Sequence, residues 1–189
     1  NTYGILTTAN INKILPTIIS RSQIVTFHSL NKSLIEEELI NLGFNVMSSK
    51  VVSQITNSID DALDIINNDS FLPLLDLVIE VMNIVARNEE SIILYFNENS
   101  SIIYEESNTQ LFLSFLIMYQ KDIVSDKINN KNNIVFSEEI ETIEQIGSFK
   151  DKDRLINELE DMLSLLSRLE FSINRSLAFD NLLLKLERR

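Results

Sequence analysis

The spacing of apolar and polar residues divides the chain into a short N-terminal segment with strand-like runs and a longer helical remainder. Residues 5–8 (Ile-Leu-Thr-Thr) and 23–27 (Gln-Ile-Val-Thr-Phe) are short runs rich in apolar and β-branched residues, which predict two strands. Between them, Pro16 restricts the preceding residue to extended geometry and suits the first turn of a helix. The pattern therefore predicts a strand, a turn, a short helix and a second strand up to residue 28.

Residues 30–69 carry apolar residues at helical spacing in three short segments. Gly43 follows the first segment, in the position that commonly ends a helix, and Ser48 or Ser49 is a candidate cap for the second. We expect three short helices. Their apolar faces are formed by Leu34, Ile35, Leu39 and Ile40, then by Val51, Val52 and Ile55, and then by Ala62, Leu63 and Ile66.

Residues 70–189 have the pattern of a larger helical block. Residues 71–86 are apolar on nearly every side and predict a buried helix, and residues 108–127 form the clearest long helix, with an aromatic stripe typical of a core. Other helices are expected over 91–96, 138–146, 151–171 and from residue 173 onward. Loops are expected at 97–101 and in the Asn-rich run 128–133, and Gly147 is expected to end the helix before it.

The composition supports a packed, mainly helical chain. Of its 189 residues, 44% are apolar, which is enough to form a core and excludes a disordered chain. Only three glycines and two prolines are present, which favours helices with short connections. The expected fold class is therefore mainly α, with about two strands near the N-terminus. Because two strands cannot bury both of their faces alone, we expect the chain to be a fragment of a larger sheet-containing protein.

The charge balance makes the chain a poor general binder of nucleic-acid backbones. Sixteen basic and 28 acidic residues give a net charge of −12, and phosphate binding needs clustered cations. Two small basic clusters are present, Lys150/Lys152/Arg154 and Arg188-Arg189, and both are mixed with acidic residues or lie at an end of the chain. We expect both clusters to be solvated surface.

Several classes of site and location are excluded or disfavoured by residue type. Without cysteine, the chain has neither disulfides nor thiolate metal ligands, and the single His28 cannot form a metal site alone, so no metal is expected. Neither a signal peptide nor an apolar run long enough to span a bilayer is visible. We therefore expect a cytoplasmic protein that does not bind membranes.

One eighteen-residue string carries a specific resemblance. Residues 5–22 read Ile-Leu-Thr-Thr-Ala-Asn-Ile-Asn-Lys-Ile-Leu-Pro-Thr-Ile-Ile-Ser-Arg-Ser. The string resembles the sensor-1 strand and the Ser-Arg-Cys arginine-finger motif of the AAA+ clamp-loader subunits of bacterial DNA polymerase III, with Ser22 where that family usually has cysteine. The resemblance implies a C-terminal fragment of such a subunit, and of the delta prime subunit in particular.

A second string separates the delta prime type from the motor type of subunit. Residues 57–63 read Asn-Ser-Ile-Asp-Asp-Ala-Leu, where motor subunits have Gly-Ser-x-Arg-Asp-Ala-Leu. The motor arginine reaches the γ-phosphate of the subunit's own ATP, and Asp60 stands in its place here. A carboxylate is repelled by a triphosphate, so this difference favours a subunit that does not hydrolyse ATP. Asp60 and Asp61 would also stabilise the first turn of a helix through its dipole.

A looser resemblance covers the remainder of the chain. Residues 121–124 (Lys-Asp-Ile-Val) and 172–184 are partly similar to the collar domain of delta prime subunits, although Ser172 replaces an asparagine of that pattern. The resemblance implies three regions. Residues 1–29 would be the end of the AAA+ core, 30–69 a helical lid, and 70–189 a helical collar or oligomerisation domain.

The resemblance also implies a function and a site. Arg21 would be an arginine finger acting in trans on the ATP of a neighbouring subunit, with Ser20 and Ser22 shaping its turn. Thr8 and Asn10, in the sensor-1 region, would be structural. The chain would need no cofactor of its own and would have no catalytic activity by itself, although it would belong to a DNA polymerase holoenzyme.

The implied partners are the motor ATPase and delta subunits of a hetero-pentameric clamp loader, and through them the sliding clamp and primed DNA. Self-association of the fragment is a further expectation, since a truncated sheet exposes edges and apolar faces. Two alternatives stay open. One is the motor ATPase of the same complex, which would need a phosphate-binding loop and an arginine at position 60. The other is an unrelated helical adaptor, in which Arg21 would merely cap a helix end.

Overall fold

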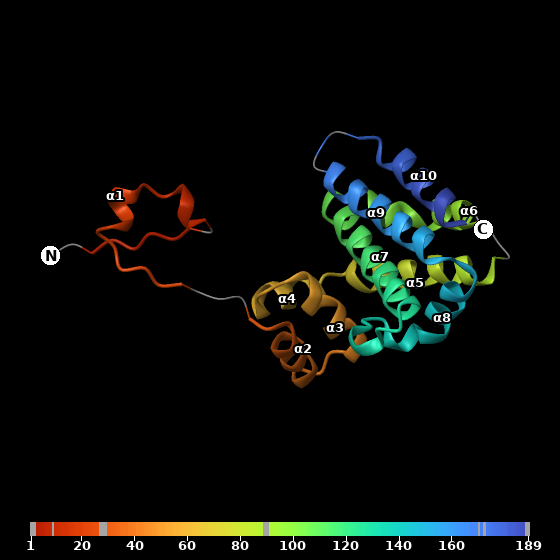
Figure 1. Ribbon diagram of the computed structural model, residues 1–189, viewed down its shortest axis with the longest axis horizontal. Helices are drawn as coiled ribbons and strands as arrows, with labels where there is room; N and C mark the ends of the chain where they lie inside the picture. Colours follow the sequence, from red (N-terminus) through yellow and green to blue (C-terminus); the bar gives the residue numbers. More distant parts are fainter. Residues whose placement is uncertain are drawn as a thin grey trace.

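The computed structural model describes residues 3–8, 10–26, 30–88, 91–169, 171 and 173–187, with the side chains of residues 106 and 132 left aside. His28 and the Arg188-Arg189 pair lie outside these residues. The described chain consists of α-helices and short 3₁₀ helices joined by loops (Figure 1), which confirms the mainly helical fold class.

The N-terminal segment differs from the prediction. It contains a 3₁₀ turn, η1 (Ile11–Lys13), and one short helix, α1 (Pro16–Ile19), and lies apart from the other helices (Figure 1). The predicted strands are wrong for the residues described, because 5–8 and 23–26 have no regular structure. A strand needs a neighbour to pair its backbone N–H and C=O groups, and here Ile5 and Val25 are 93% and 64% exposed.

Three short helices follow, as the spacing of apolar residues predicts: α2 (Lys32–Asn41), α3 (Val46–Ile55) and α4 (Ile59–Ile66). Each begins at a side-chain cap. Asn31, Asn45 and Ser58 accept backbone N–H groups of the first turn. The cap of α3 is therefore Asn45, and the prediction of Ser48 or Ser49 is wrong. Gly43 has a φ of +95°, a left-handed conformation that follows the end of α2 as predicted.

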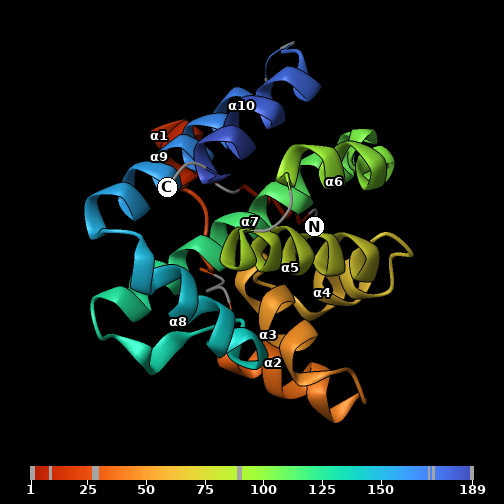
Figure 2. The same ribbon diagram turned by 90° about the vertical axis from the view of Figure 1, so that its right-hand side faces the viewer.

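The larger helical block, which we call the body, is arranged around one long helix, α7 (Glu106–Lys127). This helix contacts α5 (Phe71–Arg87), α8 (Ile140–Phe149) and α9 (Lys152–Arg168), and it also meets α3 (Figure 2). The body is completed by α6 (Ile92–Asn99), η2 (Ser100–Tyr104), η3 (Lys131–Asn133), η4 (Ser137–Glu139) and α10 (Arg175–Glu187).

Two predicted boundaries are wrong. Residues 97–101, predicted as a loop, continue α6 and pass into η2. Gly147 lies inside α8 and does not end it, since the helix continues to Phe149. The Gly147 carbonyl accepts a hydrogen bond from Lys127 Nζ at 2.6 Å, which ties the end of α7 to α8.

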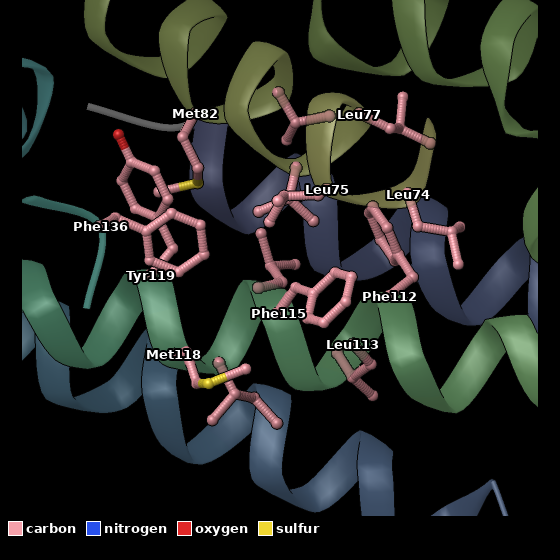
Figure 3. Packing of buried hydrophobic residues seen from close by; sticks show 14 of the residues in the cluster. Leu74, Leu75, Leu77, Met82, Phe112, Leu113, Phe115, Met118, Tyr119 and Phe136 are labelled. Atoms are coloured by element: carbon pink, nitrogen blue, oxygen red, sulfur yellow. The ribbon is translucent and has the colours of Figure 1, made fainter. Parts of the chain in front are cut away.

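The core is one cluster of buried side chains that extends from α2 to α10. Figure 3 shows its centre, where Phe112 and Phe115 of α7 face Leu74 and Leu75 of α5. Phe179 of α10 packs against both Phe96 and Phe112, with ring centroids 5.6 and 5.7 Å apart. The aromatic stripe on α7 is therefore core, as its spacing predicts. Among the described residues, none of the helices has the length and apolar character needed to cross a membrane.

Candidate functional site

The candidate site is the turn of Ser20, Arg21 and Ser22 that follows α1. Pro16 begins this helix, and Leu15 before it has the extended backbone that proline imposes on its predecessor. Upstream, Thr8 and Asn10 close a second turn. The Thr8 hydroxyl both accepts from Asn10 N and donates to Asn10 O, each at 3.1 Å. The contacts of these two residues are local, in keeping with a structural role.

Both serines of the turn donate hydrogen bonds back to α1. Ser20 Oγ donates to the Thr17 carbonyl at 3.3 Å, and Ser22 Oγ donates to the Ile18 carbonyl at 2.8 Å. The Ile18 carbonyl also accepts the backbone N–H of Arg21 at 3.1 Å. The last carbonyls of this helix are thus satisfied by backbone and serine groups, and the arginine side chain is not needed to cap them.

Arg21 itself is exposed. Within the described residues, no hydrogen bond or ion pair engages its guanidinium. A guanidinium is charged at every physiological pH and offers five N–H donors in a planar fork, which suits phosphate and carboxylate groups. The turn can therefore present one positive charge to an anionic group of another molecule. No described group of acidic or histidine residues could hold a metal.

Asp60 and Asp61 lie in the first turn of α4 and are exposed. Ser58 Oγ accepts the Asp61 N–H at 3.1 Å, so the helix begins with a side-chain cap followed by two carboxylates. This arrangement fits the favourable interaction of acids with a helix N-terminus. It places two negative charges at the exposed start of α4.

One member of the expected surface cluster Lys150/Lys152/Arg154 is buried, and the prediction was wrong for that residue, whereas Lys152 is exposed as predicted. Lys150 is only 2% exposed, and its ammonium donates to Glu158 Oε1 and Oε2 at 2.8 and 3.0 Å and to the Leu186 carbonyl at 3.0 Å. Arg154 Nε and Gln120 Nε2 also donate to Glu158, at 2.9 and 3.1 Å. We call these residues the Lys150 network. It joins α7, α9 and the end of α10.

Burial lowers the pKa of the Lys150 ammonium, and the Glu158 carboxylate opposes that shift. The spacing of Lys150, Arg154 and Glu158, four residues apart in succession, is the signal that could have indicated this cluster. Glu158 shares the buried side of α9 with Leu155, Met162 and Leu165. An acidic residue on the apolar side of a helix predicts that a cation is buried beside it.

Asp122, in the predicted collar string, has a clear local role. Its Oδ2 accepts the backbone N–H groups of Val135 and Phe136, each at 2.8 Å. Burial raises its pKa to about 6, while these two hydrogen bonds and the charge of Lys50 act in the opposite direction. Lys50 Nζ from α3 donates to the adjacent Ile134 carbonyl. The loop at 134–136 is therefore held from both α3 and α7.

Comparison with known proteins gives two relatives. The chain is 22% identical over 188 residues to the DNA polymerase III subunit delta′ of Bacillus subtilis (strain 168). This alignment covers 99% of this chain and 57% of that protein. It is 29% identical over 143 residues to the uncharacterized protein MG007 homolog of Mycoplasma pneumoniae (strain ATCC 29342 / M129 / Subtype 1), covering 72% of this chain and 51% of that protein.

Neither a family model nor a solved structure matches the chain. The chain spans about half the length of the curated relatives it matches. The match to the delta′ subunit nevertheless includes almost every residue, so it covers the helical body as well as the Arg21 turn. The chain is thus distantly similar, over nearly its whole length, to a subunit of DNA polymerase III.

Proposed function

We propose that this chain is the C-terminal part of a non-motor clamp-loader subunit of the delta prime type, which helps to load the sliding clamp onto primed DNA during replication. The similarity to the Bacillus subtilis delta′ subunit over 99% of the chain supports this role. The helical body, which extends from α5 to α10, would be the collar that joins the subunit to its neighbours. The proposal places the protein in the cytoplasm, with no catalytic activity of its own.

The observation that carries the proposal is the exposed Arg21 guanidinium, which has no partner among the described residues and lies on a turn whose helix end is already satisfied by Ser20 and Ser22. In the proposed complex, this arginine reaches the ATP held by the adjacent motor subunit. Charge builds on the phosphoryl oxygens during transfer, and a planar guanidinium stabilises it. Trans-acting arginines of this kind accelerate hydrolysis by about 10³–10⁵ in well-studied GTPases.

The N-terminal segment is the surface that such a subunit would place against other protein. Ile5, Leu6, Ile24 and Val25 are 93, 71, 54 and 64% exposed, which is unusual for a segment so rich in apolar residues. We propose that an α/β core covers these apolar side chains. The exposed Phe171, Leu177 and Leu184 would serve in collar contacts with neighbouring subunits.

The subunit itself would not hydrolyse ATP, and the nucleotide would belong to its neighbour. Asp60 supports this part of the proposal, because a carboxylate in the first turn of α4 opposes rather than stabilises a γ-phosphate.

The test uses the full-length subunit that contains this sequence, reconstituted with its motor and delta subunits, clamp and primed DNA. We expect Arg21→Ala to lower the clamp- and DNA-stimulated ATP turnover at least about tenfold, a threshold set well below the 10³–10⁵ range of arginine-finger effects. Arg21→Lys should retain little more ATP turnover than Arg21→Ala, because an ammonium lacks the planar fork of the guanidinium. Lys13→Ala removes another exposed cation of the same segment and serves as the matched control.

Size-exclusion chromatography of each reconstituted complex distinguishes loss of catalysis from loss of assembly. Unchanged turnover in an intact Arg21→Ala complex would overturn the arginine-finger role and leave the chain as a passive collar. An equal loss of ATP turnover with Lys13→Ala would show that any cation of the segment contributes, and that Arg21 has no specific role.

A further inference from the structure

A groove of about 440 Å³ runs along one side of α7, where α3 and α9 approach this helix. From α7 it is lined by Ser114, Ile117, Met118, Lys121, Asp122 and Ser125, which recur at intervals of three and four residues. These positions form one continuous stripe of a helix. We call this site the α7 groove. Its volume falls in the range of sites that accept a small ligand or a few side chains of a peptide.

Part of the lining of the α7 groove is apolar. Ile117 and Met118 of α7 are buried residues that line it, Ile55 comes from the end of α3, and Leu166 comes from α9. Leu163, also on α9, stands at the groove and is 43% exposed. An apolar side chain that entered the groove would find aliphatic and thioether surface on several sides.

Two cations border this apolar surface. Lys32 Nζ donates to the Gln54 carbonyl and to Gln54 Oε1 at 3.1 and 3.2 Å, so one of its three N–H donors is left over. Lys121 is exposed and, within the described part of the chain, makes neither an ion pair nor a hydrogen bond. The Asp122 carboxylate also lines the groove, but its Oδ2 is held by two backbone N–H groups.

Three other described lysines each have an acidic partner. Lys131 pairs with Glu144, Lys150 with Glu158, and Lys185 with Asp161. Lys32 and Lys121 instead have no acidic partner among the described residues, and both stand beside the apolar lining of the groove. The combination is complementary to a ligand that is both apolar and negatively charged.

We propose that the α7 groove binds an acidic, amphipathic segment of a partner protein, whose apolar side chains rest on Ile117, Met118 and Leu166 while its carboxylates pair with Lys121 and Lys32. An amphipathic helix that lays its apolar face in a groove is a common mode of peptide recognition. This binding is independent of the role of Arg21, because the groove involves none of the residues before Lys32.

The first measurement is fluorescence anisotropy with a synthetic peptide of about fourteen residues that has leucine at helical spacing and glutamate elsewhere. A second peptide replaces each glutamate with lysine. We expect the acidic peptide to bind the full chain at least about tenfold more tightly than the basic one, and to weaken as salt is added. Equal binding of both peptides would overturn the proposed role of charge.

Variants then locate the binding site. Lys121→Glu should weaken the acidic peptide about tenfold, since it replaces an attraction with a repulsion at the groove. Because Lys121 has no described intramolecular partner, this change should not disturb the fold. Lys152→Glu changes the net charge equally at an exposed position in the first turn of α9 and should alter binding less than about twofold. Similar losses from both variants would indicate attraction to net charge alone and overturn the proposal.

A third variant blocks the groove without changing charge. Ser114→Trp places a large side chain in the α7 stripe, and circular dichroism before and after the change verifies the fold. We expect loss of peptide binding at unchanged helicity; full binding would overturn the proposed position. Light scattering on the free protein tests another occupant. Self-association that Lys121→Glu abolishes would identify a second copy of this chain in the groove and overturn the partner proposal.

Discussion

Replacing Lys150 by methionine should destabilise the chain strongly, although the substitution keeps a long, unbranched side chain. The ammonium makes three hydrogen bonds of 2.8–3.0 Å, two to Glu158 and one to the Leu186 carbonyl. Both charged side chains of the pair are buried, with 1% and 5% of their side-chain areas exposed. When the ammonium is removed, the buried Glu158 carboxylate and the buried Leu186 carbonyl each lose hydrogen bonds.

The expected loss follows from what remains around Glu158. Breaking a buried pair by removing one partner costs about 3–5 kcal/mol. Arg154 and Gln120 still donate to Glu158 after the substitution, so we expect a value near the lower end, about 3 kcal/mol. Glu158→Leu should cost more, because Lys150 then keeps only the Leu186 carbonyl.

The assay is urea unfolding followed by circular dichroism, with Lys152→Met as the control. Lys152 is exposed, so its variant should stay within about 0.5 kcal/mol of the parent. The double variant Lys150→Met/Glu158→Leu should lose about 1–3 kcal/mol less than the sum of the single variants. A loss below about 1 kcal/mol for Lys150→Met would refute the reasoning, since that value is typical of an exposed ion pair.

Two further predictions concern Asp122 and Gly147. The folded state raises the Asp122 pKa from its ordinary value of 3.8 to about 6, so it favours the protonated carboxyl. This contribution to stability is full below pH 4 and is lost as the pH rises through about 6. Chemical unfolding at a series of pH values measures this effect. Between pH 4 and pH 7, the free energy of unfolding of the parent should fall by up to about 3 kcal/mol relative to that of Asp122→Asn. Parallel pH profiles of the two proteins would contradict the shifted pKa. Gly147→Ala should raise the free energy of unfolding by about 0.5–1 kcal/mol, because alanine favours the helix and its Cβ would lie 3.5 Å from Asp126 Oδ2, an ordinary contact. A lower melting temperature for this variant would mean that Asp126 cannot accept the methyl group.

Most helices of the chain could be predicted from the spacing of apolar residues, because that spacing records which side of each helix is buried. The long helix at 108–127 was predicted within two residues of its observed start, Glu106. Gly147 was misread because glycine commonly ends helices, whereas here the α8 backbone continues through it. The strand-like runs at 5–8 and 23–27 reflect intrinsic preference, and a strand also needs a paired neighbour, which no local pattern supplies.

The candidate site was predicted only in part. The motif singled out Arg21, but it could not indicate that Ser20 and Ser22 donate to the carbonyls of α1, so that the helix end does not need the guanidinium. Lys150 was assigned to the surface because its neighbours in sequence are charged. Its burial depends on the Leu186 carbonyl, 36 residues further along the chain, and contacts at such separations arise only when α9 and α10 pack together.

The loop at 134–136 has a consequence for the motions of the chain. Lys50 of α3 holds its first carbonyl, and Asp122 of α7 holds its next two N–H groups. A swing of α2, α3 and α4 relative to the body must therefore detach this loop from α3 or from Asp122. Such a motion resembles local unfolding, with the slow kinetics of a cooperative opening, rather than the rapid bending of a free linker. The two groups of helices should thus tumble as one particle, although no continuous helix connects them.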